Sequence, residues 1–175
     1  KILKKNGTAN PKISAVGGPC LASGLANRIK SSVVLASKNI EIVKEIGKII
    51  STSYYSTEFT DDLIGVEVCA ATKNIYSMLI GASEGLSGNN IDSEIKKKYY
   101  LNTAASLIYK SLSDINKLTK KLKGKYETVF GLAGLGDLHV SAAGGRNSMM
   151  GNYLGKGLLY NCLLYTSDAA DEMRR

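Results

Sequence analysis

Hydrophobic residues in the stretch 61–86 fall on every side of a helical wheel, which sets this stretch apart from the rest of the chain. The pattern predicts one long helix, and a helix that is apolar on every side normally lies inside a folded domain. Asp, Glu, Lys and Asn residues interrupt the stretch, so we do not expect it to span a membrane. Lys73 stands in its middle. We expect its ammonium group either to reach out to water or to stand at the wall of a pocket, where lysines are suited to proton transfer.

The segment before this helix alternates short apolar runs with one helical repeat. The β-branched run at 31–37 predicts a buried strand, and residues 13–16 and 53–59 predict two more strands. Asn39 is a typical helix-capping residue, and a helix is predicted from about residue 40 to 51. Its apolar positions are Ile42, Val43, Ile46, Ile49 and Ile50. A strand, a helix and a strand at this spacing indicate part of an α/β sheet.

Strands are not predicted after residue 61, where a mainly α-helical region begins. A Gly/Asn loop at 87–90 leads to a second long helix, predicted from about 92 to 122, and a short helix is predicted at 126–132. The apolar stripe of the second helix consists of Ile95, Tyr99, Leu101, Ala105, Ile108, Leu112, Ile115, Leu118 and Leu122. Its lysines fall mostly outside this stripe, as on a solvated face. The fold class is therefore an α/β remnant followed by a mainly α-helical domain, with the boundary near Thr60.

The charge balance raises nucleic acid as a partner, because 23 Lys and Arg residues against 15 Asp and Glu residues give a net charge of +8. The excess is lysine spread over helical surfaces, with few arginines and without interleaved aromatic residues. This distribution is more typical of a solvated face or of attraction for small anionic substrates. Cys20, Cys69 and Cys162 lack CxxC spacing and suit a reducing cytosol. His139, the single histidine, has no suitably spaced partners, so we expect no metal site.

The two ends of the chain differ from its middle. The chain opens without a start methionine or a secretory signal, and we expect it to be a fragment. Residues 162–175 contain no lysine, asparagine or isoleucine, although all three are common before them. This tail resembles translated adapter sequence, so we expect it to be non-native.

Three glycine-rich segments could carry chemistry. The segment 131–137, GLAGLGD, lies between predicted helices, so it does not fit a dinucleotide-binding loop. Its glycines would let two backbones approach closely and let Asp137 face a cleft, although an aspartate here is also a common helix cap. The segment 144–147, GGRN, is predicted to be a flexible turn whose arginine could bind phosphate or simply be solvated. The segment 17–20, GGPC, ends a strand where α/β sheets bind ligands, or makes an ordinary tight turn.

The order of four motifs resembles the NAD(P)-dependent glycerol-3-phosphate dehydrogenase family. The motifs are GGPCLASGLA, DDLIGVEVCAATKN, FGLAGLGDL and GGRN, and the resemblance covers about residues 13–157. It implies that residues 1–60 end a Rossmann domain and that 61–161 form an incomplete helical substrate domain. The implied cytoplasmic activity interconverts dihydroxyacetone phosphate and sn-glycerol 3-phosphate by hydride transfer with NAD or NADP, supplying glycerophospholipid synthesis. The fragment itself would be inactive, because it contains no GxGxxG nucleotide-binding half.

The resemblance also implies roles for individual residues. Lys73 matches the family's general base, and Asp137 matches the aspartate that holds the substrate and the lysine in place. Arg146 and Asn147 match the pair that contacts substrate phosphate, with Arg146 also contacting the cofactor. Gly18 matches a substrate-binding residue and Ala22 a cofactor-binding residue. The sequence departs from the family pattern at four positions, Cys20, Thr72, Gly145 and Ser148.

Two alternatives stay open at this point. One is a related two-domain 2-hydroxyacid or ketopantoate-type reductase, which is not expected to carry GLAGLGDL and GGRN together. The other is a basic helical nucleic-acid-binding module, which predicts salt-sensitive binding of DNA or RNA. The expected partner is a small phosphorylated substrate rather than nucleic acid, and a homodimer is left open. The choice between NAD and NADP is also open, because the selecting residue would lie upstream.

Overall fold

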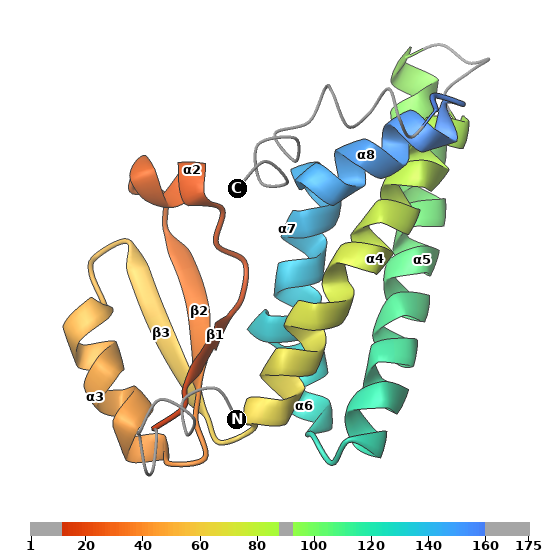
Figure 1. The fold of residues 1–175 in the computed structure, drawn as a ribbon. Coiled ribbons are helices and arrows are strands. Elements are labelled where there is room, and N and C mark those ends of the chain that lie inside the picture. Colours follow the sequence, from red (N-terminus) through yellow and green to blue (C-terminus); the bar gives the residue numbers. More distant parts are fainter. Residues whose placement is uncertain (1–11, 88–92, 160–175) are drawn as a thin grey trace.

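The chain forms a small sheet beside a group of helices in the computed structural model, which describes residues 12–87 and 93–159, with the backbone alone for 93–99 (Figure 1). The sheet contains β1 (Ala15–Gly17), β2 (Ser31–Ala36) and β3 (Tyr55–Thr60), in that order. β1 is antiparallel to β2, with Ala15 opposite Ala36, whereas β2 is parallel to β3, with Ala36 beside Thr60. The predicted fold class, an α/β remnant followed by a mainly helical region, is confirmed.

Helix α3 (Ile40–Ile50) connects β2 to β3 and covers one face of the sheet. The predicted cap is confirmed, because the Asn39 side chain accepts a hydrogen bond from the backbone N–H of Glu41 at 3.1 Å. The predicted apolar stripe is partly wrong, since Ile49 is 81% exposed. Val43 and Gly47 are the buried positions of α3, and Gly47 lies against Phe59 of β3, so Ile49 is turned off the sheet. A short helix, α2 (Ala22–Ala26), was not predicted.

Two long helices, α4 (Leu63–Ser87) and α5 (Ser93–Lys121), pack side by side, as Figure 1 shows. Both predicted long helices are confirmed to within two residues at each end. The main core cluster draws on both of them and on the helices that follow. Its buried members are Val68, Cys69, Ile80, Ala104, Leu112, Ile115, Val129, Leu138 and Ala142.

The predicted stripe of α5 is only partly correct. Leu112 and Ile115 are buried, but Leu101, Leu118 and Leu122 are 62%, 40% and 48% exposed. The buried face instead includes two small polar residues, Ser111 and Thr119. Ser111 can be buried because its hydroxyl donates to the Leu107 carbonyl at 2.7 Å, one turn earlier. The stripe positions Ile95 and Tyr99, the loop positions 88–90 and the tail 162–175 lie outside the described residues or side chains.

Helix α4 is not buried on every side, which corrects the prediction. Ile75 and Leu79 are 59% and 51% exposed, and Leu86 is 71% exposed, along one side of the helix. By length and composition alone, α4 is the one described helix that could cross a membrane. In this structure α5, α7 and α8 pack against it, which is the arrangement of a core helix.

The chain after α5 folds into four short segments that pack on α4. They are α6 (Tyr126–Phe130), a π-helix (Leu132–Gly136), α7 (Asp137–Gly144) and α8 (Arg146–Gly155). The expected turn at 144–147 is wrong: Gly144 ends α7, Gly145 alone separates the helices, and Arg146 begins α8. A second core cluster joins the sheet to α4 and the π-helix. Its members are Val34, Ala36, Leu63, Val66 and Ala133.

Candidate functional site

Lys73 and Asp137, far apart in the sequence, form an ion pair. The Lys73 Nζ atom lies 2.6 Å from the Asp137 Oδ2 atom, and the side chains are 26% and 8% exposed. Asp137 is the first residue of α7, and Lys73 lies near the middle of α4. The sequence left open whether the Lys73 ammonium reaches into water or lies against the protein. The structure places it against the protein, in a partly buried position. The ammonium is held by a carboxylate and keeps partial access to solvent.

The side of α4 that carries Lys73 is lined by small residues. At four-residue steps after Lys73 come Ser77, Gly81 and Gly85, all three buried. Positions four apart lie on one side of a helix. This small-residue row is where α8 crosses α4, and Lys73 stands at the end of the row nearest the sheet.

The π-helix aims Asp137 at α4. Its wide turn is marked by a hydrogen bond from the Gly136 N–H to the Gly131 carbonyl, five residues earlier, at 3.1 Å. A Cβ atom on Gly134 would collide with the carbonyl of Val129, so this turn closes only with glycine there. Such π-turns are rare and occur frequently at functional sites. The glycines of GLAGLGD thus permit a close backbone approach immediately before Asp137, which is buried rather than open to a cleft.

The strand-end segment 17–20 lies beside the π-helix. Gly17 is buried, and an added Cβ there would meet Val66 of α4 at 3.0 Å and Ala133 of the π-helix at 3.2 Å. Gly18 has a φ of +133°, a conformation that strains other residues. Pro19 packs on Gly136, where an added Cβ would lie 3.2 Å from its ring. The segment therefore ends next to the residue that precedes Asp137.

Helix α8 crosses α4 at backbone distance and thereby fixes the position of the GGRN motif. A Cβ atom on Gly81 would collide with the Ser148 carbonyl, and one on Gly151 would collide with the Met78 carbonyl. Gly85 and Gly155 repeat the arrangement one turn later. This contact was missed from the sequence, although glycines spaced by four in both segments are a recognisable signal.

Arg146 and Asn147 occupy the first turn of α8, just before this crossing. The Arg146 side chain is exposed, and Asn147 is half-buried. The next residue, Ser148, is buried and donates its hydroxyl to the Ala142 carbonyl of α7 at 2.7 Å. The first-turn N–H groups of a helix lack intrahelical partners and favour anions. A guanidinium beside such amides is chemically suited to a phosphate group.

The structure brings two of the predicted site residues into direct contact and places a third close to them. Lys73 and Asp137 are in direct contact, and Gly18 lies one residue from Pro19, which packs beside Asp137. Ala22 is exposed at the start of α2. Within the described part of the chain, no group of three or more His, Cys, Asp or Glu side chains is placed to hold a metal ion.

A buried thiol lies one turn below Lys73 on α4. Cys69 is 1% exposed, and burial raises the pKa of its thiol from 9.0 to about 12, with the charges of Asp62 and Asp137 adding to the effect. The thiol therefore stays protonated at neutral pH and contributes apolar packing next to the ion pair.

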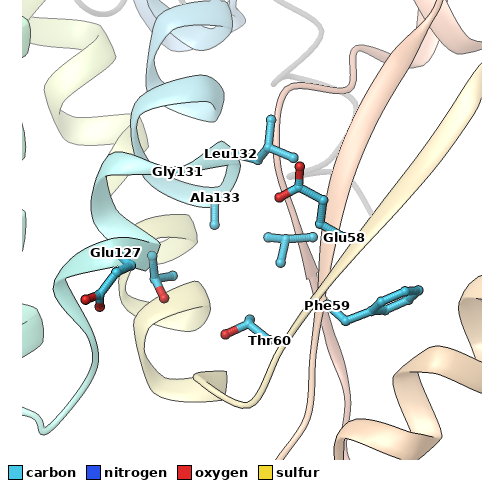
Figure 2. Close-up of a pocket in the computed structure, with 9 residues that line it drawn as sticks. Glu58, Phe59, Thr60, Glu127, Gly131, Leu132 and Ala133 are labelled. Atoms are coloured by element: carbon cyan, nitrogen blue, oxygen red, sulfur yellow. The ribbon is translucent and has the colours of Figure 1, made fainter.

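A pocket at the edge of the sheet is separate from this site. A cavity of about 150 Å³ lies between the end of β3 and the segment of α6 and the π-helix. Figure 2 shows the residues that line it. Glu58 and Glu127 stand on its two sides, and neither Lys73 nor Asp137 lines it. Two carboxylates disfavour a phosphorylated ligand there.

Comparison with known proteins identifies the family. Residues 62–168 match the family model described as the C-terminus of NAD-dependent glycerol-3-phosphate dehydrogenase. The chain belongs to this family. The resemblance drawn from the four motifs is therefore confirmed, and the described residues of α4 to α8 form part of the family's C-terminal domain.

Individual relatives agree with this assignment. The NADP(+)-dependent glycerol-3-phosphate dehydrogenase of Archaeoglobus fulgidus is 36% identical, and the match covers 82% of this chain and 41% of the relative. The glycerol-3-phosphate dehydrogenase [NAD(P)+] of Neisseria meningitidis serogroup A is 35% identical, with coverages of 90% and 45%. The crystal structure of glycerol-3-phosphate dehydrogenase from Coxiella burnetii matches with a TM-score of 0.77 at 32% identity, covering 87% of this chain and 44% of that one. The chain thus spans less than half the length of these relatives.

Proposed function

We propose that a protein containing this chain interconverts dihydroxyacetone phosphate and sn-glycerol 3-phosphate with NAD or NADP, and that Lys73 transfers the proton. The observation that carries the proposal is the contact of 2.6 Å between Lys73 and a carboxylate that is only 8% exposed. Family membership supports the reaction class. The role in glycerophospholipid supply and a cytoplasmic location belong to the same proposal.

The proposed proton transfer depends on the partly buried amine of Lys73. In the oxidative direction the neutral Lys73 amine takes the proton from the C2 hydroxyl, and in the reductive direction its ammonium returns the proton to the carbonyl oxygen. Asp137 stabilises the ammonium and restricts where Nζ can lie, at 2.6 Å from its own oxygen. A fixed Nζ keeps the amine in hydrogen-bonding reach of a bound hydroxyl, which proton transfer requires.

The start of α8 would hold the phosphate of the substrate. Arg146 supplies a charged fork, Asn147 an amide, and the first-turn N–H groups add further donors. The exposed Arg146 and the exposed start of α2 at Ala22 fit contacts with a dinucleotide, which when bound gives or takes the hydride. Because the match covers less than half of each relative's length, we expect residues 1–175 alone not to turn over.

The test is the Lys73→Ala variant in a full-length protein that contains this segment. We expect turnover to fall by roughly 100-fold or more, with a smaller change in the apparent KM of the phosphorylated substrate, because the proton-transfer group is lost while the phosphate site remains. Steady-state kinetics in both directions measure the effect.

The matched control is Lys121→Ala, which removes an exposed lysine from the last turn of α5. We expect its turnover to equal that of the parent protein. Near-normal turnover of Lys73→Ala would refute the assignment of Lys73 as the proton-transfer group.

A further inference from the structure

Asp62 is a buried carboxylate that accepts one hydrogen bond from the first turn of α4 and two from the distant segment at the start of α6. It is 5% exposed, and its Oδ1 atom accepts from the Gly65 N–H at 2.9 Å. Its Oδ2 atom accepts from the Lys125 N–H at 2.8 Å and from the Thr128 hydroxyl at 2.6 Å. Among the described residues, no cationic side chain forms an ion pair with it. Three hydrogen bonds thus hold this carboxylate in place, and they join the first turn of α4 to the start of α6.

The junction around Asp62 is packed at backbone distance. A Cβ atom on Gly65 would collide with the Asp62 carboxylate. A Cβ atom on Gly124, in the turn before α6, would lie 3.1 Å from the Gly65 nitrogen and 3.2 Å from its Cα atom. The two segments therefore cannot slide along each other without breaking the bonds to Asp62.

Two segments of the chain, here called arms, connect this junction to the ion pair between Lys73 and Asp137. One arm is α4, which rises about 16 Å from Asp62 to Lys73 at 1.5 Å per residue. The other arm runs from Thr128 through α6 and the π-helix to Asp137. Val66 of α4 and Ala133 of the π-helix belong to one buried cluster, which also contains residues of the sheet. The position of α6 along the axis of α4 thus sets the position of the Asp137 carboxylate relative to the Lys73 amine.

We propose that Asp62 is a positioning residue: by binding the Thr128 hydroxyl and the Lys125 N–H, it fixes the register in which Lys73 meets Asp137. The effect of Asp62 on turnover rests on the proposed function of Lys73. Its effect on the position of Lys73 relative to Asp137 does not depend on that function. Asp62 does not touch the substrate in this arrangement and acts only through the two arms.

The experiment uses Thr128→Val, which removes one donor to Asp62 and leaves both of its backbone donors. The first measurement, on this chain, is the rate at which acetic anhydride modifies Lys73 relative to the exposed Lys121, followed by mass spectrometry. We expect the modification rate of Lys73 relative to Lys121 to rise about fivefold. Losing the hydrogen bond from Thr128 to Asp62 would let the Lys73–Asp137 ion pair open more often, by the factor that one hydrogen bond contributes. The second measurement, in a full-length protein, is steady-state kinetics, where we expect turnover to fall about tenfold with little change in KM.

Two control variants separate positioning from general loosening. Thr119→Val makes the same substitution at a buried hydroxyl that has no hydrogen-bond partner in the described part of the chain, and it should leave Lys73 reactivity unchanged. Ile115→Val trims a residue that is 1% exposed on α5 and lowers stability without touching Asp62.

An equal rise in Lys73 reactivity in Ile115→Val and Thr128→Val, or no rise in Thr128→Val, would overturn the proposal. A rise in reactivity with unchanged turnover would support the role of Asp62 in positioning Lys73 and would instead count against the proton-transfer role of Lys73, which Lys73→Ala tests independently.

Discussion

The two long helices hold their lysines in opposite environments. On α4, Lys73 lies 2.6 Å from Asp137, and the side chains are 26% and 8% exposed. On α5, Lys110 and Lys117 lie 3.5 Å and 3.3 Å from Asp114, and the lysines are 65% and 68% exposed. The pair on α4 joins two helices, whereas the pairs on α5 stay within one helix at spacings of three and four residues.

The surroundings of each helix explain why its lysines behave differently. Lys110 and Lys117 of α5 lie outside its buried face and pair with Asp114 in water, where such pairs contribute little and are weakened by salt. Lys73 belongs to a helix that other helices contact on several sides, so its ammonium meets a protein group. A charge pair removed from water costs much more to break.

The largest expected difference comes from removing the carboxylate on each helix. Asp137→Ala leaves the Lys73 ammonium without its partner, and we expect the free energy of unfolding to fall by about 3 kcal/mol, the lower end for buried pairs because Lys73 keeps some access to water. Asp114→Ala should leave the free energy of unfolding unchanged within error, since its partners are solvated. Urea denaturation of both variants measures this. Equal losses in the two variants would show that the environments do not differ in energy.

A second variant tests why α4 can receive α8 so closely. We expect Gly81→Ala to lower the free energy of unfolding by about 2 kcal/mol, because its methyl group would collide with the Ser148 carbonyl and push α8 away. Gly144→Ala is the control, since a Cβ atom there has nothing within 4 Å. Alanine favours helices over glycine, so a stabilised Gly81→Ala protein would mean that the helices do not touch at this point. Thermal unfolding of both variants distinguishes the outcomes.

A third comparison uses pH to probe the buried side of α4. Burial raises the pKa of Cys69 from 9.0 to about 12, so above pH 9 the unfolded chain loses a thiol proton that the folded chain keeps. Unfolding is therefore favoured as pH rises from about 9 toward 12. Compared with Cys69→Ala, the parent chain should lose stability more steeply between pH 8 and pH 10.5 in denaturant titrations. Parallel curves would indicate that the thiol titrates equally in both states.

Local patterns were enough to predict most of the elements. The β-branched run in β2, the cap at Asn39 and the apolar repeats of α4 and α5 act over a few residues, so they can be recognised without tertiary contacts. The details of burial could not be predicted in the same way. The exposed Leu118 and the buried Thr119 of α5 are neighbours in sequence, and only the position of α4 and the following turn decides which of them is covered.

The start of α8 shows the limit most clearly. Two glycines before Arg146 favour a turn, and this prediction was wrong for Arg146 and Asn147. The helix forms there because Gly151 and Gly155 let it lie directly on the backbone of α4, and the buried Ser148 hydroxyl ties it to Ala142. These contacts stabilise α8 from outside, and they place it against the row of small residues that follows Lys73 on α4.

Sequence patterns were enough to predict the three strands, the order of α3 to α6, the capping of α3 and, through four motifs, the family to which the chain belongs, whereas α2 and the start of α8 were not predicted. The sequence also singled out Lys73 as a charge in an apolar helix, without deciding between water and a partner. The folded structure answers this question, because Asp137 lies 64 residues further along and reaches Lys73 through the glycine-dependent π-helix. Packing between helix backbones decides which residues meet when they lie this far apart in the sequence. A short stretch of sequence does not contain that information.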